Sequence, residues 1–430
     1  MSAPPETGAS TNCLLVIHEW KNRNFIMVTI RRFYILAGLV FLLSLVSLTG
    51  NVQSAPNAIK IYLPLITSQS SVKKVPISAG FRQTCALTSN GIAKCWGWNT
   101  RGQLGDGTTI LRTTPVGVTG LSSGTISIGA GYLHSCALDS SGGVKCWGAN
   151  DRSQLGDNTT ADSSNPVPVA GLTSGVTAIA AGDSHTCALT NGGAVKCWGL
   201  NNNGQLGNNS ITNSPFPVEV SGLSSGIKAI TSGYYFSCAL TTGSGVLCWG
   251  DNGNGQMGNN TTTRAMIPVS VSGLSSGVAA ISAGGFHVCA LLTNNGGVKC
   301  WGFNNYGELG NGTTTQSPVP IAVSGLPSGI SSIAAGQYHT CGLTTVGGVY
   351  CWGENFNGEI GDNSTTNALN PVAVTGLSSG VTTIAAGGFH TCATTTIGSV
   401  ECWGSNNFGQ LGDGIPTSAQ TTPANVINFP

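Results

Sequence analysis

The sequence predicts an all-β protein, a seven-bladed β-propeller whose blades each contain four strands. The triplet Cys-Trp-Gly occurs seven times, at successive spacings of 51, 51, 51, 52, 51 and 51 residues. Each repeat holds four short apolar patches separated by Gly, Pro, Ser and Asn, and it shows no helical periodicity longer than one turn. Four short strands in about fifty residues is typical of a propeller blade, whereas a solenoid would need helices or single-strand coils and capping repeats.

The two ends of the repeat region predict how the ring closes. A strand of the type Pro-Val-x-Val occurs in six repeats, and a degraded copy begins at Pro423. No such strand precedes the first unit, which starts near residue 75, and the motif GLxSG occurs only six times. We therefore expect the C-terminal strand to complete the first blade, which would close the ring and leave no exposed sheet edge at the termini.

The region before the repeats predicts export. Residues 33–50 form the only long apolar run, and Arg31 and Arg32 precede it. We interpret residues 27–55 as a signal peptide, with a retained membrane anchor as the alternative. We interpret residues 1–26 as an upstream extension from a start codon assigned too early, and residues 56–74 as a linker to the propeller at 75–430. The expected location is secreted or cell-surface.

Composition and motifs exclude several classes of function. Only 8% of the 430 residues are charged and the formal net charge is +1, with no basic stripe of the kind that nucleic-acid binders carry. No pair of acidic residues, Ser-His-Asp set or phosphate-binding loop stands out from the repeats. We predict neither catalysis nor a cofactor, and we expect a monomer with no nucleic-acid partner.

Cysteines fall in pairs within each repeat, ten or eleven positions apart. The residues between them read as two strand halves around a turn, so the two cysteines should face each other across an antiparallel hairpin at a distance that a disulfide accepts. An exported chain would reach an oxidising compartment, where such bonds persist. We predict seven disulfides: Cys85–Cys95, Cys136–Cys146, Cys187–Cys197, Cys238–Cys248, Cys289–Cys300, Cys341–Cys351 and Cys392–Cys402.

A zinc site is the alternative for these cysteines, because a histidine stands two positions before the first cysteine of most pairs. Gln83 and Phe236 replace that histidine in the first and fourth repeats while their cysteine pairs persist. Three ligands in one hairpin also fit a tetrahedron poorly. We predict no metal, and we expect the repeat histidines to bond backbone groups between neighbouring blades. The tryptophan of each triplet should pack between blades.

The repeat "GxxHTCAL", followed by "GGVKCWGxNxxGQLG", resembles that of the regulator of chromosome condensation family over roughly residues 75–430. The resemblance implies a seven-bladed propeller, here with cysteine at both strand positions of each pair. It also implies two models of function. One is nucleotide exchange on a nuclear small GTPase, and the other is a secreted bacterial propeller that inhibits β-lactamase by covering it with an aromatic loop face.

Two loops of each repeat should emerge on one face around the central channel. They are "GxxH", expected between the second and third strands, and "WGxNxxGQ", expected between the fourth strand and the next blade. Six of the seven repeats place an aromatic residue at the "xx" of the first loop, although only 7% of the chain is aromatic. Aromatic and arginine side chains on loops of a rigid scaffold are typical of protein-binding surfaces. The predicted partner-binding residues are Phe81, Arg82, Trp98, Tyr132, Arg152, Asp183, Tyr234, Tyr235, Phe286, Phe303, Tyr338 and Phe389. The second loop adds Arg101, Asp151, Tyr306, Glu354, Phe356 and Phe408.

The favoured function is therefore binding of an unidentified protein, in an interaction or inhibitor-like role. Binding of a carbohydrate or cell-surface glycan is the alternative, because the same rings could stack on sugars. Nucleotide exchange on a small GTPase is a further alternative. It fits less well with an exported chain whose repeats are uniform to within one residue.

Overall fold

The computed structural model describes residues 75–294, 296–416 and 419–429. All regular secondary structure in these segments is β-strand. None of the described residues forms a helix of the length and apolarity needed to cross a bilayer. The predicted signal peptide or anchor, the upstream extension and the linker lie outside the described residues, as does Cys13.

The strands form seven sheets of four, one per repeat. The first four blades consist of β1 (Ile77–Ala79), β2 (Gln83–Leu87), β3 (Ala93–Gly97) and β4 (Arg112–Gly117); β5 (Thr125–Ala130), β6 (His134–Asp139), β7 (Val144–Gly148) and β8 (Ser163–Pro168); β9 (Val176–Ala181), β10 (His185–Thr190), β11 (Val195–Gly199) and β12 (Ser214–Glu219); and β13 (Ile227–Ser232), β14 (Phe236–Thr241), β15 (Val246–Gly250) and β16 (Ala265–Ser270).

The last three blades follow the same pattern. They consist of β17 (Val278–Ala283), β18 (His287–Leu292), β19 (Val298–Gly302) and β20 (Ser317–Ala322); β21 (Ile330–Ala335), β22 (His339–Thr344), β23 (Val349–Gly353) and β24 (Ala368–Ala373); and β25 (Val381–Ala386), β26 (His390–Thr395), β27 (Val400–Gly404) and β28 (Gln420–Asn425).

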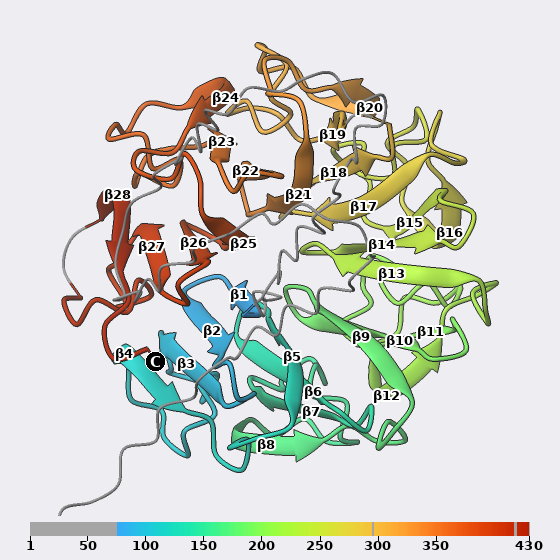
Figure 1. Cartoon of the computed structure of the whole chain (residues 1–430). Helices are drawn as coiled ribbons and strands as arrows, with labels where there is room; N and C mark the ends of the chain where they lie inside the picture. The colour runs from blue at the N-terminus through green and yellow to red at the C-terminus, as the bar shows by residue number, and fades with distance from the viewer. Residues whose placement is uncertain (1–74, 295, 417–418, 430) are drawn as a thin grey trace, which may run out of the picture. The chain divides into compact units, whose positions relative to one another are not determined.

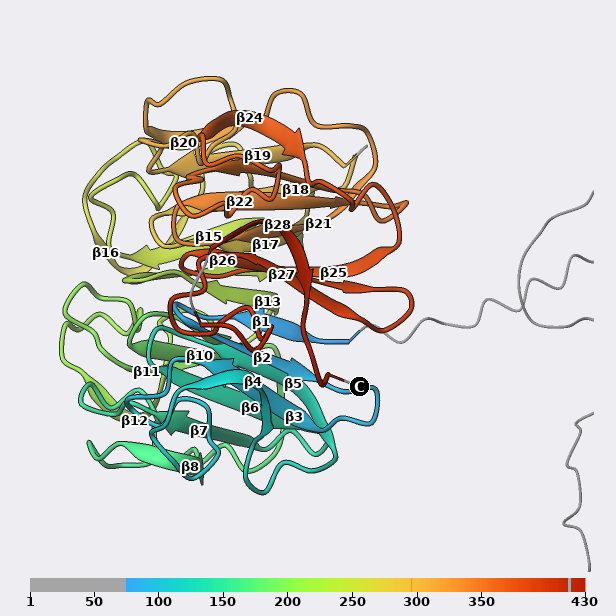
Figure 2. The ribbon, with the colours of Figure 1, turned by 90° about the vertical axis from the view of Figure 1, so that its left-hand side faces the viewer.

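Within each blade the strands pair antiparallel in chain order, and the seven blades stand around a central channel (Figure 1). The first strand of each blade ends beside the channel and the fourth lies at the outer rim, so the loops emerge at the two ends of the ring (Figure 2). The predicted all-β, seven-bladed propeller with four-stranded blades is confirmed.

The predicted closure of the ring is wrong, because each blade is built from one continuous segment. The Pro-Val-x-Val strand is the fourth strand of its own blade. In the first blade Cys95 pairs with Val116 on β4, and in the last blade Cys402 pairs with Ala424 on β28. Seven such strands serve seven blades, and the six GLxSG segments are the links between them. The outer strand also suits proline, which has no N–H to offer a further strand.

The first and last blades are joined instead by the contacts used between other neighbouring blades. The Gly388 backbone N–H donates to the Gly80 carbonyl at 2.9 Å, and the Trp96 indole N–H donates to the Gln410 carbonyl at 2.9 Å. The last described residue, Phe429, lies edge-on to the Trp96 ring, with centroids 6.1 Å apart. Side-chain packing and hydrogen bonds therefore close the ring without an exchanged strand.

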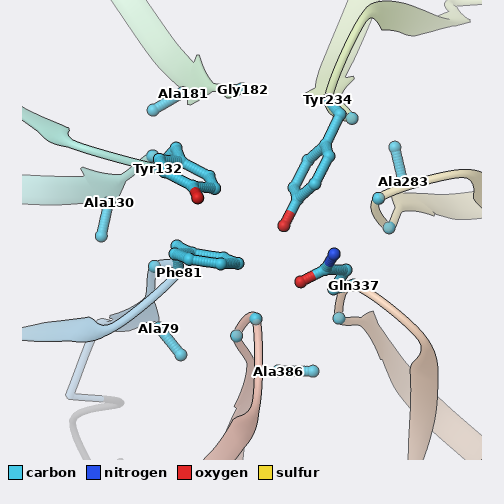
Figure 3. A pocket seen from close by; sticks show the side chains of 18 of the residues that line it. Ala79, Phe81, Ala130, Tyr132, Ala181, Gly182, Tyr234, Ala283, Gln337 and Ala386 are labelled. Carbon is cyan, nitrogen blue, oxygen red and sulfur yellow. The ribbon is translucent and has the colours of Figure 1, made fainter. Parts of the chain in front are cut away.

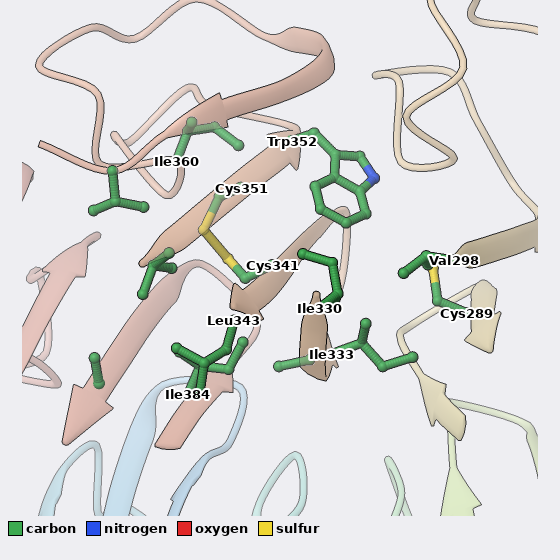
Figure 4. Packing of buried hydrophobic residues seen from close by; sticks show 14 of the residues in the cluster. Cys289, Val298, Ile330, Ile333, Cys341, Leu343, Cys351, Trp352, Ile360 and Ile384 are labelled. Carbon is green, nitrogen blue, oxygen red and sulfur yellow. A yellow bond between two sulfur atoms is a disulfide. The ribbon is translucent and has the colours of Figure 1, made fainter. Parts of the chain in front are cut away.

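All seven predicted disulfides are present, including the pair with the extra residue, Cys289–Cys300. The paired cysteines lie directly opposite each other in the register of the second and third strands, as Cys187 and Cys197 do. All fourteen are at most 1% exposed. Figure 4 shows Cys341–Cys351 in the core near Trp352, so each disulfide is part of the apolar packing of its blade.

Each Cys-Trp-Gly tryptophan is fully buried and anchors its blade to the preceding one, as expected. The Trp198 indole N–H, for example, donates to the Gln154 carbonyl of the second blade at 2.9 Å. The same bond recurs at all seven boundaries, with lengths of 2.8–3.0 Å. Removing one of these rings would therefore loosen two blades at once.

The five repeat histidines also join neighbouring blades, but through a hydroxyl group and not through the backbone as predicted. The His339 Nε2 atom lies 2.8 Å from Thr391 Oγ1 of the next blade. The Thr391 hydroxyl donates to the Glu359 carbonyl at 2.9 Å, so the imidazole Nε2–H must be the donor to Thr391. Equivalent pairs are His134–Thr186, His185–Ser237, His287–Thr340 and His390–Thr84.

The boundary between the fourth and fifth blades shows the rule behind this pairing. Phe236 replaces the histidine, and Val288 replaces the hydroxyl residue that would accept its hydrogen bond. Both are fully buried and belong to one apolar cluster. The two changes occur together because a histidine facing Val288 would be buried without an acceptor for its Nε2–H. A hydroxyl can remain without the histidine, as Ser135 does opposite Gln83, because it still donates to the Gln103 carbonyl at 2.9 Å.

Candidate protein-binding face

The GxxH and WGxNxxGQ loops emerge at the same end of every blade, as predicted. They follow the first and third strands, however, and not the second and fourth as predicted. The first of them begins with glycine because the blades crowd around the channel. A Cβ atom on Gly182 would lie 2.6 Å from the Gly233 carbonyl oxygen of the next blade. Short backbone bonds between these loops, such as the Gly285 N–H to the Gly336 carbonyl at 3.0 Å, fix them relative to one another. The side chains on this face therefore stand on a rigid base.

Aromatic rings from six blades form a continuous series on this face. The centroids of consecutive rings are 3.8–6.1 Å apart, and most contacts are edge-to-face. In order, the series runs Phe389, Phe81, Tyr132, Tyr234, Phe286, Tyr338, Tyr306 and Phe356, with Tyr235 and Phe303 at its side. We call these ten residues the aromatic face.

Arg82 extends the aromatic face toward the first and last blades. Its guanidinium carbon lies 4.8 Å from the Phe81 centroid, 5.2 Å from that of Trp98 and 4.6 Å from that of Phe408. The Trp98 and Phe408 rings are 5.3 Å apart. Three rings around one guanidinium hold the arginine in place by cation–π attraction.

The rings also narrow the mouth of the channel, where a cavity of about 110 Å³ is lined largely by Gly and Ala. Phe81 and Tyr132 stack across one side of the mouth, and the Tyr234 hydroxyl and the Gln337 amide point into it from the other (Figure 3). The Tyr234 hydroxyl and Gln337 Oε1 are buried and have no hydrogen-bond partner among the described residues. Side chains from several blades therefore constrict this end of the channel.

A polar sector interrupts the rings at the second and third blades. Arg101 forms ion pairs with Asp162 and Asp151, and Arg152 lies 3.8 Å from Asp151. Arg101, Asp151, Arg152 and Asp183 border a hollow of about 680 Å³ that is also lined by Tyr132, Tyr234, Tyr235 and Phe286. The face therefore combines an aromatic arc with one charged hollow.

The structure brings the twelve predicted partner-binding residues together on this face. Seven line the hollow, and the other five contact one another or those seven through ring or cation–π contacts. Arg152 is exposed, ten are half-buried, and Phe81 is 8% exposed because Tyr132 stacks on it. The pattern of repeats gave no sign of the ion pair to Asp162 or of the unpartnered Tyr234 hydroxyl. Among the described residues, no three His, Cys, Asp or Glu side chains gather so as to hold a metal ion.

Two models of known protein families match this chain. The family model of the RCC1-like domain matches residues 112–429, and that of the regulator of chromosome condensation (RCC1) repeat matches residues 73–103. The chain belongs to the RCC1-like family.

Relatives of this RCC1-like propeller include plant and animal proteins. The ultraviolet-B receptor UVR8 of Arabidopsis thaliana is 32% identical over 348 residues, which are 80% of this chain and 79% of the receptor. The mitochondrial RCC1 domain-containing protein RUG3 of the same plant is 32% identical over 78% of this chain and 82% of its own length. The human E3 ubiquitin-protein ligase HERC2 is 32% identical, but the match spans only 7% of that protein.

Solved structures show the same fold for RCC1-like propellers. Prp20p from Saccharomyces cerevisiae superposes with a TM-score of 0.71 at 24% identity, over 80% of this chain and 87% of Prp20p. That structure was described together with the binding of Prp20p to Gsp1p and histones. Human WBSCR16 superposes with a TM-score of 0.65, also at 24% identity, over 73% of this chain and 84% of WBSCR16. At these identities the likeness establishes the fold alone.

Three glutamates lie buried beside the aromatic face of this RCC1-like propeller. Glu308 and Glu359 replace the glutamine of "GQLG" found in the other five repeats, and Glu354 lies near both. Burial raises the pKa of Glu308 to about 7, and burial together with the neighbouring carboxylates raises the pKa of Glu354 to about 7. Within the part of the chain that the structure describes, Glu308 Oε1 and Glu354 Oε2 have no hydrogen-bond partner. These sites favour a protonated carboxyl group.

Replacing Glu308 by glutamine should stabilise the protein at alkaline pH. The pKa of Glu308 is higher in the folded state than the ordinary value of 4.5, so ionisation lowers stability as pH rises from 4.5 to about 7. We expect Glu308→Gln to raise the melting temperature by about 3–5 °C at pH 8 and to leave it unchanged at pH 4. The reverse change in the third blade, Gln205→Glu, should lower the melting temperature at pH 8. Equal effects of Glu308→Gln at both pH values would contradict this account.

Proposed function

We propose that this RCC1-like propeller is an exported protein-binding module that covers its partner with the aromatic face. The observation that carries the proposal is the continuous series of half-buried rings on one end of the ring of blades. Rigid aromatic side chains lose little conformational entropy on binding, and they dominate the energetics of protein interfaces. Phe356 is 58% exposed at one end of the series, where a partner would bury it.

Export is part of the proposal because of the disulfides. Every blade carries one, and such bonds form and persist in oxidising compartments but are rare in the cytosol. The apolar run at residues 33–50 is consistent with a signal peptide. An inhibitor-like role would require no group on the face to react, since covering the partner is sufficient.

The arrangement of the rings supports a protein partner over a glycan. Sugars bind by stacking on free ring faces, whereas Phe81 and Tyr132 stack on each other and most other rings meet edge-to-face. What remains accessible is a mosaic of ring edges and charged tips around Arg82 and Arg152. This mosaic resembles a protein interface more than a sugar platform.

Comparative capture from culture supernatant tests the proposal. The baits are the wild type, a face variant with Phe303→Ala, Tyr306→Ala and Phe356→Ala, and a control variant with Val346→Ala and Ile397→Ala. The control positions are 72% and 88% exposed on turns between second and third strands, at the opposite end of the blades. We expect the face variant to capture at least tenfold less of one protein than the wild type does. The control variant should capture the same amount of that protein as the wild type.

Two results would contradict the proposal. The first is equal capture by the wild type, the face variant and the control. The second is loss of capture when the partner is deglycosylated, which would assign the face to glycan binding.

A further inference from the structure

The Asp183 carboxylate lies at the edge of the hollow and forms no ion pair with a cation of the described residues. Its Oδ2 accepts a hydrogen bond from the neighbouring Ser184 hydroxyl at 2.7 Å. The arginines of the polar sector pair elsewhere, Arg101 with Asp162 and Asp151, and Arg152 with Asp151. Within the described part of the chain, Asp183 takes part in no ion pair, and burial raises its pKa. A half-buried carboxylate therefore stands at this edge without an ion-pair partner among the described residues.

Three tyrosines, Tyr132, Tyr234 and Tyr235, line the same hollow as this carboxylate. Burial raises the pKa values of all three, and the charge of Asp183 adds to the increase, while Arg82 opposes it at Tyr132. Tyr132 and Tyr234 meet edge-to-face at 6.1 Å, and Tyr234 and Tyr235 at 6.2 Å. Aromatic rings beside a carboxylate form a setting that attracts cations, because the ring faces carry negative electrostatic potential.

The polar atoms that lack partners in the mouth of the channel point to the same kind of ligand. Gln337 Oε1 is a buried acceptor, and neither it nor the Tyr234 hydroxyl has a hydrogen-bond partner in the described segments (Figure 3). Both residues line the hollow together with Asp183. A group that donates several hydrogen bonds and carries positive charge would satisfy them all, and guanidinium and ammonium groups have these properties.

We propose that the hollow is a receptor for one basic side chain, arginine or lysine, that a partner protein inserts between Asp183 and the tyrosines. This inference rests on the proposed protein-binding function. A volume of about 680 Å³ is ample for one extended side chain. Tyr132, Tyr234 and Phe286 belong both to the hollow and to the aromatic face, so one partner would bury its apolar surface on the rings and its cation in the hollow.

An anionic ligand does not fit this hollow. Asp183 and Asp151 both border it, and the two nearby arginines are already neutralised by aspartates. A neutral ligand that covered the half-buried Asp183 carboxylate would bury its charge without a counter-ion, which is unfavourable.

Titration of the purified chain with N-acetyl-arginine amide tests the proposal, followed by tyrosine fluorescence or by NMR. N-acetyl-citrulline amide has nearly the same shape without the charge and is the control ligand. We expect saturable binding of the arginine derivative, at least tenfold weaker in Asp183→Asn, and no binding of the citrulline derivative. Glu219→Gln makes the same change of charge at an exposed site on the outer strand β12 and should bind as the wild type does. Equal binding of both ligands, or wild-type binding by Asp183→Asn, would overturn the proposal.

Capture of the partner separates this inference from the proposed function. If Phe303→Ala, Tyr306→Ala and Phe356→Ala abolish capture while Asp183→Asn captures at the wild-type level, the receptor is refuted and the proposed function stands. A tenfold or greater loss with Asp183→Asn, reversed by an arginine-to-citrulline change in a partner peptide, supports the receptor. If the arginine derivative binds but no captured partner competes with it, the hollow is a site for free cations and the assignment to a partner's side chain is overturned.

Discussion

Acidification from pH 7.5 to pH 4 should lower the melting temperature by about 10 °C or more, with the steepest decline below pH 5. The reason lies in the five histidines between blades, each fully buried and hydrogen-bonded to a hydroxyl of the next blade. Burial lowers the pKa of His134 to about 4 and the pKa values of His185, His287, His339 and His390 to about 3.

The direction of this effect follows from the two states. An unfolded histidine binds a proton near pH 6.5, whereas the folded one does so only near pH 3–4. Stability is therefore complete above pH 6.5 and is lost as pH falls toward the folded pKa. At pH 4 each histidine costs on the order of 3 kcal/mol, and Glu308 and Glu354 offset part of the sum because they gain protons more readily when folded.

Exchanging one histidine boundary for the apolar boundary found between the fourth and fifth blades isolates the cause. His339→Phe combined with Thr391→Val copies the natural pair Phe236 and Val288. We expect a melting temperature near that of the wild type at pH 7.5 and a decline at pH 4 that is about 4 °C smaller. Calorimetry across pH 4–8 measures both. A double variant that declines as steeply as the wild type would mean that these histidines do not limit stability in acid.

This boundary also shows what the sequence makes predictable. The spacing of Cys-Trp-Gly and the cysteine pairs predicted the number of blades, the strand order within each hairpin and all seven disulfides, because these depend on short-range periodicity. The prediction of ring closure is wrong because a repeat period does not reveal where a unit begins. The sequence pattern predicts that Pro423 completes the first blade, whereas it lies in β28, the edge strand of the last blade. The joint change at Phe236 and Val288 is visible in the sequence, and it was the signal that the histidines pair with hydroxyls.

The functional face was predictable in outline and not in detail. Loop positions that vary between repeats located the aromatic residues, because the propeller places equivalent loops at one end. Whether a given ring is free or stacked depends on its neighbours from other blades, as the burial of Phe81 beneath Tyr132 shows. Arg101 pairs with Asp151 and Asp162 of the next blade and not with Asp183. Because these ion pairs join different blades, no local sequence pattern predicts them.

Complete reduction of the seven disulfides should lower the melting temperature by about 20 °C. Each bond joins two cysteines that are ten or eleven positions apart in the sequence. In the chain-entropy model, closing such a loop adds about 2.5–3 kcal/mol to the free energy of unfolding by restricting the unfolded chain. The sulfur-bearing side chains are at most 1% exposed, so the folded protein should resist a reductant in the absence of denaturant. Reduction must therefore be carried out on the unfolded chain, followed by refolding with the reductant present.

Protein taken through the same unfolding and refolding without reductant is the control, since it separates loss of the bonds from failure to refold. The single-blade variant Cys187→Ala, Cys197→Ala should melt about 3–4 °C below the wild type, which tests whether the contributions of separate blades add. A reduced chain that melts within a few degrees of the oxidised one would show that packing of the seven tryptophans suffices. In that case the disulfides would no longer argue for an oxidising compartment, and the proposal of export would rest on the apolar run at residues 33–50 alone.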